Sequence, residues 1–135
     1  MYVIDANIFL EFLLQQDKAT ICENFLKKVE EGRIKATISL FTIHSIIIVL
    51  ERYGKEQDRT TFLSTLTKIR GLTIYENTFQ DTVKAVKLMQ KYKLDFEDSL
   101  TLQTYFSCNC SAMVSFDSDF NKVKDINRKT PEQIS

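Results

Sequence analysis

The stretch Tyr2-Val3-Ile4-Asp5 is a short hydrophobic run that ends in an aspartate. The same pattern recurs late in the chain, where Asp117 follows the hydrophobic run Ala112–Phe116. A third aspartate, Asp98, lies in the polar opening of another apolar segment. In a fold built from strand–helix units, such positions converge at one edge of the sheet, where open α/β folds bind their ligands.

Segments typical of strands alternate along the chain with segments typical of helices. Apolar side chains recur at helical spacing over residues 7–14, 19–31, 40–52, 57–70, 78–92 and from about residue 96 onward. Strands are predicted at 2–4, 34–38, 72–75 and 113–116, followed by a short helical turn through residue 120 and a possible edge strand at 123–126. Strand is an alternative interpretation of the aliphatic segment 40–52. The alternation predicts an α/β fold with a mostly parallel central sheet.

Size and composition are those of one soluble globular domain. The 135 residues are 44% hydrophobic and 27% charged, with one proline and three glycines. We expect a single domain over residues 1–135, with a loosely ordered polar tail at 127–135. Neither a leader sequence nor a membrane-spanning run is visible, so we expect no membrane association. The three cysteines lack the spacing of a zinc site, which favours reduced thiols in a cytoplasmic protein.

Eighteen acidic residues balance eighteen basic ones, so no global positive field exists to attract nucleic acid. Any contact with phosphates must therefore be local. The candidates are two basic groups, Lys84, Lys87 and Lys91 on one predicted helix and Lys122, Lys124, Arg128 and Lys129 near the end of the chain. A charged stripe of this kind is also typical of a solvated helix face.

Each candidate aspartate taken separately also has a structural explanation. Asp5, Asp117 or Asp119 could cap a helix or shape a turn, and acids such as Asp95 and Asp98 are favoured at a helix start. Capping alone does not readily explain two strand ends and a helix start that deliver acids to one sheet edge. Crowded carboxylates repel one another unless a divalent cation neutralises them, and their oxygen atoms favour Mg²⁺ or Mn²⁺. The pattern predicts metal-assisted phosphodiester chemistry.

Other phosphate-handling folds of this class lack their signatures here. The chain contains no glycine-rich Walker loop, no GxGxxG after the first strand and no Gly-x-Ser-x-Gly elbow. A phosphatase with a phosphotransferring aspartate would usually carry Asp-x-Asp after the first strand, whereas this chain has Asp5-Ala6-Asn7. Release of phosphate from monoester substrates would test that alternative.

Three stretches together resemble the PIN-domain family, and especially its VapC-like ribonuclease toxins. Val3-Ile4-Asp5-Ala6-Asn7 is similar to the opening strand of the family, Leu94-Asp95-Phe96-Glu97-Asp98-Ser99 to its central acidic helix start, and Val114–Phe120 to its late strand and acidic turn. The resemblance covers nearly the whole chain. It implies a three-layer α/β/α sandwich with a mostly parallel central sheet.

The resemblance also implies a site and an activity. Asp5, Asp98 and Asp117 would be the catalytic, metal-binding carboxylates and Asp119 a further metal ligand. Supporting positions would be Asn7 and Ser115, which shape the pocket, together with Asp95 and Ser45. The implied activity is Mg²⁺- or Mn²⁺-dependent endonucleolytic cleavage of single-stranded RNA by the toxin of a toxin–antitoxin pair. An antitoxin protein and a second copy of the chain, in a homodimer, would be its partners.

One position departs from the family pattern. PIN domains usually carry a glutamate in the helix after the second strand, and the matching position here is Ser45. A missing carboxylate would weaken the hold on a second cation. The alternative function is therefore a catalytically weakened PIN domain that acts as an RNA-binding or protein-interaction module. The neighbouring His44 could ligate a metal, but it points about 100° away around the helix and a Mg²⁺-type site prefers oxygen ligands, so we expect an ordinary, partly buried histidine. Glu51 points about 120° away and lies too far along the helix to replace the missing carboxylate.

Several aromatic side chains could serve protein–protein contacts. Phe12, Tyr53 and Phe62 are the candidates, although apolar residues on helices more often belong to the core.

Overall fold

The computed structural model describes residues 1–54 and 56–134. Within them, a single parallel sheet has the strand order β3-β2-β1-β4-β5, formed by β1 (Tyr2–Ile4), β2 (Ala36–Ser39), β3 (Leu72–Tyr75), β4 (Ala112–Val114) and β5 (Arg128–Lys129). The helices are α1 (Ala6–Leu13), α2 (Ala19–Glu30), α3 (Leu40–Arg52), α4 (Glu56–Leu66), α5 (Phe79–Tyr92) and α6 (Phe96–Ser107), with 3₁₀ turns η1 (Ser118–Lys122) and η2 (Pro131–Gln133). The predicted α/β fold with a parallel sheet is confirmed.

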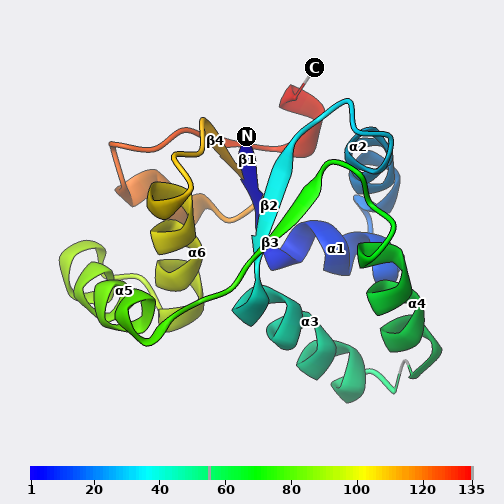
Figure 1. Cartoon of the computed structure of the whole chain (residues 1–135), viewed down its shortest axis with the longest axis horizontal. Helices are drawn as coiled ribbons and strands as arrows, with labels where there is room; N and C mark the ends of the chain where they lie inside the picture. Colours follow the sequence, from blue (N-terminus) through cyan, green and yellow to red (C-terminus); the bar gives the residue numbers. More distant parts are fainter. Residues whose placement is uncertain (55, 135) are drawn as a thin grey trace.

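The sheet forms the middle of three layers (Figure 1). Helices α5 and α6 cover one face, and α1, α2, α3 and α4 lie on the other side. Successive strand residues point to opposite faces, so Val3 and Met113 pack into the core under α6, whereas Ile4 and Val114 pack into the core under α1 and α2. This alternation buries both faces of the sheet, as parallel sheets require.

The carboxyl ends of β1 and β4 lie side by side at the same edge of the sheet. Ile4 is in register with Val114, and the Asp5 amide donates to the Val114 carbonyl at 3.0 Å. The chain turns directly into α1 after Asp5 and reaches η1 after Asp117, because each aspartate caps the helix that follows it. Residues far apart in sequence therefore meet at one edge.

Most predicted elements are present with shifted ends. Strand β2 begins at Ala36 rather than residue 34, α4 ends at Leu66 rather than residue 70, and β4 ends at Val114 rather than residue 116. The long aliphatic segment is helical, as α3. The predicted edge strand at 123–126 is wrong, because Val123 and Ile126 pack against the core under α6 from a loop, while the pairing strand is β5.

The expectation of a loosely ordered tail at 127–135 is corrected by the packing of residues 127–134. After β5, the chain forms η2 against α2, and Ile134 is only 5% exposed within the core under α1 and α2. The Thr130 amide donates to Gln133 Oε1 at 2.9 Å, which fixes this turn. A single apolar side chain in a polar stretch is enough to anchor it, since folding buries Ile134. Residue 135 lies outside the described residues, and the single-domain organisation stays a prediction.

Gly71 marks a close approach between α2 and β3. A Cβ at this position would lie 2.2 Å from the Ile34 carbonyl oxygen and 2.6 Å from that of Val29, and the Gly71 amide donates to the Val29 carbonyl at 2.9 Å. Only glycine fits such a contact. Gly32 and Gly54 instead adopt positive φ angles of 78° and 65°, which suit the ends of α2 and α3.

Cys22, Cys108 and Cys110 are free thiols, and burial raises the pKa of Cys22 to about 12 and that of Cys110 to about 11. These two thiols are therefore poor nucleophiles at neutral pH.

Among the described residues, the helices lack the length and apolar character needed to cross a bilayer.

Candidate metal centre

Asp5 lies between the end of β1 and the start of α1. Its side chain is 6% exposed, and its Oδ1 accepts the Ala6 amide at 2.8 Å as the N-cap of α1. Its Oδ2 accepts the Ser115 hydroxyl at 2.6 Å and the Asn7 side-chain amide at 3.4 Å. Both carboxylate oxygens are thus held in fixed directions.

Burial is the main influence on the ionisation of Asp5. Loss of solvation raises its pKa to about 6, and the nearby charges of Asp117 and Glu97 act in the same direction. Hydrogen bonds from Ser115 and Ala6 oppose the rise because they stabilise the ionised form. The carboxylate therefore retains its charge at neutral pH with the help of its donors.

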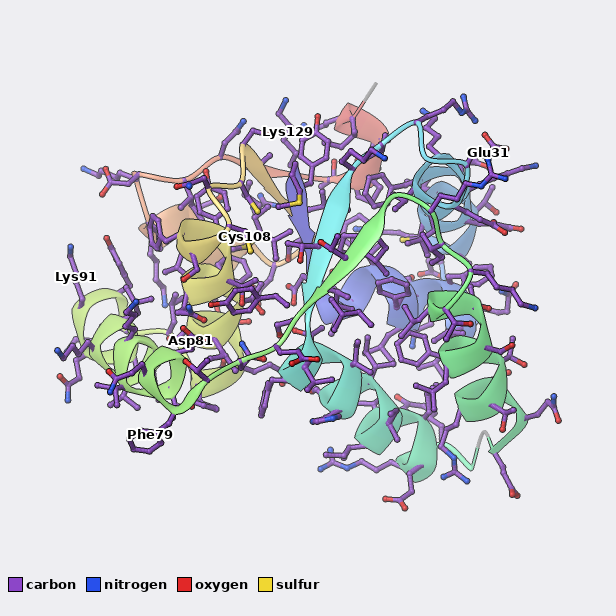
Figure 2. The ribbon with its side chains drawn as sticks, viewed as in Figure 1. Glu31, Phe79, Asp81, Lys91, Cys108 and Lys129 are labelled. Atoms are coloured by element: carbon purple, nitrogen blue, oxygen red, sulfur yellow. The ribbon has the colours of Figure 1, made fainter. Side chains whose placement is uncertain are left out.

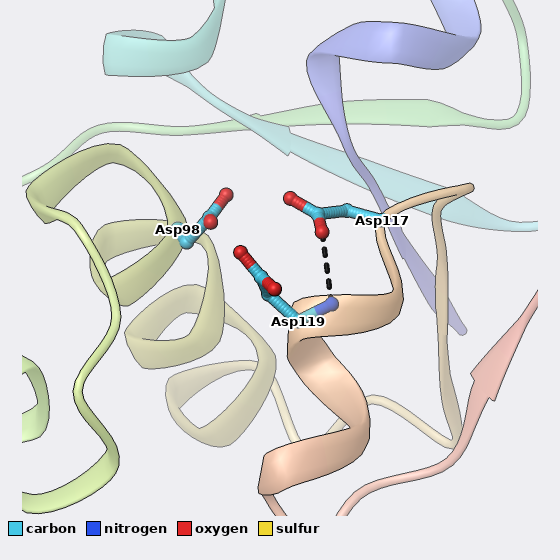
Figure 3. Close-up of side chains that lie close together, drawn as sticks. All are labelled: Asp98, Asp117 and Asp119. Atoms are coloured by element: carbon cyan, nitrogen blue, oxygen red, sulfur yellow. Dashed lines mark hydrogen bonds between the residues drawn. The ribbon is translucent and has the colours of Figure 1, made fainter.

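Three further carboxylates face one another across the space beside α6. Asp98, Asp117 and Asp119 each offer one oxygen, and these oxygens lie within 4.8 Å of one another. Figure 3 shows Asp98 reaching from α6 toward Asp117 and Asp119 on the turn that begins η1. Asp117 Oδ1 accepts the Asp119 amide at 2.9 Å, which fixes both residues relative to each other. One ion could contact all three side chains.

Burial and neighbouring negative charges raise the pKa of Asp98 to about 8. Burial is the largest cause, followed by the negative charges of Asp5, Asp95, Asp117 and Glu97. A carboxyl group in this environment holds its proton unless a positive charge neutralises its neighbours. A donor set of carboxylate oxygens is what Mg²⁺ and Mn²⁺ prefer, so the residues present fit such an ion.

Ser115 and Asn7 hold the two strand ends together. The Ser115 hydroxyl donates to Asp5 and accepts from the Asn7 side chain at 3.3 Å and from the Asp117 amide at 3.0 Å. The Asn7 side-chain oxygen accepts the Phe116 amide at 3.5 Å. These bonds make Ser115 the link between Asp5 and Asp117.

Asp95 occupies a different place from the facing carboxylates. It is exposed and caps α6, since its Oδ1 accepts the Asp98 amide at 2.8 Å. Its contribution within the described structure is to fix the start of the helix that carries Asp98 and to add negative charge nearby. Its role as a supporting residue stays a prediction, as do the ligand roles assigned to Asp5, Asp98, Asp117 and Asp119.

Ser45 makes a contact with Glu97 that the sequence did not predict. The Ser45 hydroxyl donates to Glu97 Oε1 at 2.6 Å, which places a carboxylate from α6 against α3. The acids at positions 95, 97 and 98 are visible in the sequence, but nothing local pairs Glu97 with a residue 52 positions earlier. His44 is exposed, so the expectation that it is partly buried is wrong.

The basic and aromatic candidates have mixed outcomes. Lys122 donates to the Lys93 carbonyl, and Arg128 donates to the Ser115 carbonyl at 3.0 Å, so both already have partners within the protein. Phe62 is 2% exposed and belongs to the core beside Phe9, so its proposed surface role is wrong.

Of the other two aromatic candidates, Tyr53 is 58% exposed, and Phe12 packs half-buried against the core. The most exposed of the large apolar side chains in the described residues is Phe79, which extends outward at the start of α5 (Figure 2). Phe79 directly follows Thr78, the N-cap of α5. The local sequence therefore indicates the start of a helix and does not indicate that this aromatic side chain is exposed.

Known structures share this architecture. A toxin–antitoxin complex from Klebsiella pneumoniae is 22% identical, with 97% of this chain and 98% of that chain covered and a TM-score of 0.68. VapC20 of Mycobacterium tuberculosis, described as a sarcin–ricin loop cleaving toxin, is 10% identical over 92% and 95% of the two chains with a TM-score of 0.76. VapBC2 of Rickettsia felis, bound to promoter DNA, is 15% identical over 96% and 97% with a TM-score of 0.73.

At these identities the likeness shows a common fold. No curated protein sequence gives a significant match. Residues 2–126 match the PIN domain, and this match includes every strand up to β4 and all the facing carboxylates. The chain belongs to the PIN domain family.

Proposed function

We propose that this protein is a metal-dependent endoribonuclease that cleaves single-stranded RNA and acts as the toxin of a toxin–antitoxin pair. The observation that carries the proposal is the group of Asp98, Asp117 and Asp119, whose oxygens lie within 4.8 Å of one another. A PIN domain that brings these carboxylates together has the acidic side chains that a metal-dependent phosphodiesterase requires.

Each residue has a distinct role in the proposed reaction. Asp98, Asp117 and Asp119 would hold a Mg²⁺ or Mn²⁺ ion, and Asp5, the further predicted ligand, would add its negative charge beside Asp98. When bound, such a cation would activate a water and stabilise charge on the scissile phosphate. Ser115 and Asn7 keep Asp5 oriented, and Asp95 fixes the start of α6.

The RNA substrate and the protein partners of this chain are proposed by analogy with similar structures. VapC20 is described as a toxin that cleaves the sarcin–ricin loop, and the similar structure from Klebsiella pneumoniae is a toxin–antitoxin complex. By analogy, this chain would cleave RNA, bind an antitoxin, form a homodimer and act in the cytoplasm. Single-stranded RNA suits a site at a sheet edge because its flexible backbone and splayed bases can follow the surface.

The decisive experiment measures cleavage of a labelled single-stranded RNA with Mg²⁺, with Mn²⁺ and with a chelator. Wild-type protein should cut internally with either ion and stop when the ion is removed. Asp98→Asn and Asp117→Asn should each lower the rate at least about 100-fold, since even the loss of a residue that only orients a metal ligand costs about 10–100-fold. The exposed Asp125→Asn should retain the wild-type rate as a charge-matched control. Absence of cleavage with both ions would reject the proposal.

Ser45 favours one alternative, a weakened PIN domain that binds RNA or protein without efficient cleavage. In that case the missing carboxylate limits the reaction, and Ser45→Glu should raise the cleavage rate substantially. A wild-type protein that is already fully active would exclude this alternative.

A further inference from the structure

We propose that Glu97 supplies, from α6, the carboxylate that PIN domains usually carry on α3, and that Ser45 positions it. This inference rests on the proposed function, because it assigns Glu97 as an additional ligand of the same divalent cation. Glu97 is then a metal ligand, and Ser45 is a positioning residue that acts through it.

The Ser45–Glu97 hydrogen bond places the Glu97 carboxylate close to where the side chain of a glutamate at position 45 would end. A glutamate at position 45 would extend its chain from the same Cβ that carries the Ser45 hydroxyl. The Ser45 Oγ stands where the next atom of that glutamate would stand, and Glu97 Oε1 lies 2.6 Å beyond it. The Glu97 carboxylate therefore occupies the region that a glutamate on α3 would reach.

The packing of α3 against α6 makes this position reproducible. Phe41, one helical turn before Ser45, meets Phe96 edge to face with a centroid separation of 5.4 Å. Phe96 directly precedes Glu97 in the chain. The aromatic pair thus anchors the two helices immediately beside the hydroxyl–carboxylate contact.

A purely structural bond would not require a charged residue here. Glutamine could accept the same hydrogen bond from Ser45 without adding negative charge beside Asp98 and Asp5, which already repel one another. Glu97 is half-buried, and its charge acts on both aspartates. A carboxylate in this position destabilises the metal-free site and becomes favourable when a cation binds. The oxygen that Ser45 does not use is free of that bond and can face the cation.

The test measures Mn²⁺ binding by isothermal titration calorimetry, together with the thermal midpoint of the metal-free protein. Glu97→Gln keeps the acceptor for Ser45 and removes the charge. It should weaken Mn²⁺ binding at least about tenfold without lowering the thermal midpoint. Ser45→Ala should weaken binding about threefold or more because it releases Glu97. Glu51→Gln, an exposed residue on α3, removes the same charge elsewhere and should bind Mn²⁺ like the wild type.

A double substitution that exchanges the residues at positions 45 and 97, called the swapped pair, tests whether Mn²⁺ affinity can be restored. Ser45→Glu combined with Glu97→Ser places the carboxylate on α3 and the hydroxyl on α6. It should return Mn²⁺ affinity to within about threefold of the wild type, since ligand charge and position are restored. Ser45→Glu alone should give no such gain, because it adds a second carboxylate to the same space.

The outcomes separate this inference from the proposed function. If Glu97→Gln binds Mn²⁺ like the wild type while Asp98→Asn does not, the metal centre stands and the role of Glu97 is refuted. If Glu97→Gln loses affinity but the swapped pair does not recover it, the transfer from α3 to α6 is refuted. If wild-type protein fails to bind Mn²⁺, both proposals fall.

Discussion

The Ser115 hydroxyl donates a 2.6 Å hydrogen bond to Asp5 Oδ2, although the two residues lie 110 positions apart in the sequence. The bond joins the end of β1 to the end of β4 and stabilises a buried negative charge. It also opposes the effect of burial on the pKa of Asp5, which is about 6. The stability of the site therefore depends on a neutral side chain outside the carboxylate group.

Replacing Ser115 by alanine should destabilise the protein in a pH-dependent way. Above pH about 6, where Asp5 is ionised, the loss of this donor should cost about 1–3 kcal/mol. Below pH about 4, the protonated carboxyl loses less from the same change. Urea unfolding at both pH values measures the difference, with the exposed Ser118→Ala as control. Equal costs at the two pH values would contradict the prediction.

Asp98 should make the metal-free protein less stable as pH rises. Its folded-state pKa of about 8 lies above its ordinary value of 3.8, so between these values the folded state keeps a proton that the unfolded state has released. Stability therefore falls as pH rises through this window, and the penalty is complete above pH about 8.

Asp98→Asn removes this penalty. After allowance for solvent screening, the variant should exceed the wild type by at least about 1 kcal/mol above the window and match it below the window. Denaturant titrations with a chelator present would measure this. Mn²⁺ should stabilise the wild type more than the variant, and a variant that is the less stable protein at high pH would disprove the account.

Gly71→Ala should be strongly destabilising because the added Cβ would collide with two backbone carbonyl oxygens. We expect a loss of more than about 2 kcal/mol, or failure to fold, since backbone atoms cannot move aside as a flexible side chain can. Gly54→Ala is the matched control, because its Cβ would meet nothing within 4 Å and only the positive φ of 65° is unfavourable. That variant should lose about 1 kcal/mol. Similar urea midpoints for the two variants would refute the close approach at Gly71.

Ile134→Ala should show whether the end of the chain is part of the core. Its side chain is 5% exposed, so truncation should cost about 2–4 kcal/mol in the free energy of unfolding. Ile48→Ala, at a position that is 50% exposed, should change stability by less than about 0.5 kcal/mol. A negligible effect at Ile134 would favour the loosely ordered tail that the polar sequence suggests.

Part of the candidate site could be predicted because its signals are local. The hydrophobic run before Asp5, the run before Asp117 and the acidic opening around Asp98 can each be read from a few neighbouring residues. In a parallel sheet, strand ends must share an edge, so the convergence of these acids also followed from the alternation of elements. The same residues serve as helix caps at Asp5 and Asp117, which shows that the capping and functional interpretations are compatible.

The sequence by itself determined the types and order of the main elements, since the periodicity of apolar side chains fixes them locally. Only the tertiary structure decided that Glu97 meets Ser45, that Phe62 is buried and that Ile134 closes the core. It also decided that Gly71 lies against α2. These facts depend on how helices and strands far apart in the chain pack together, and that packing is settled by the shape of the whole core rather than by any local pattern.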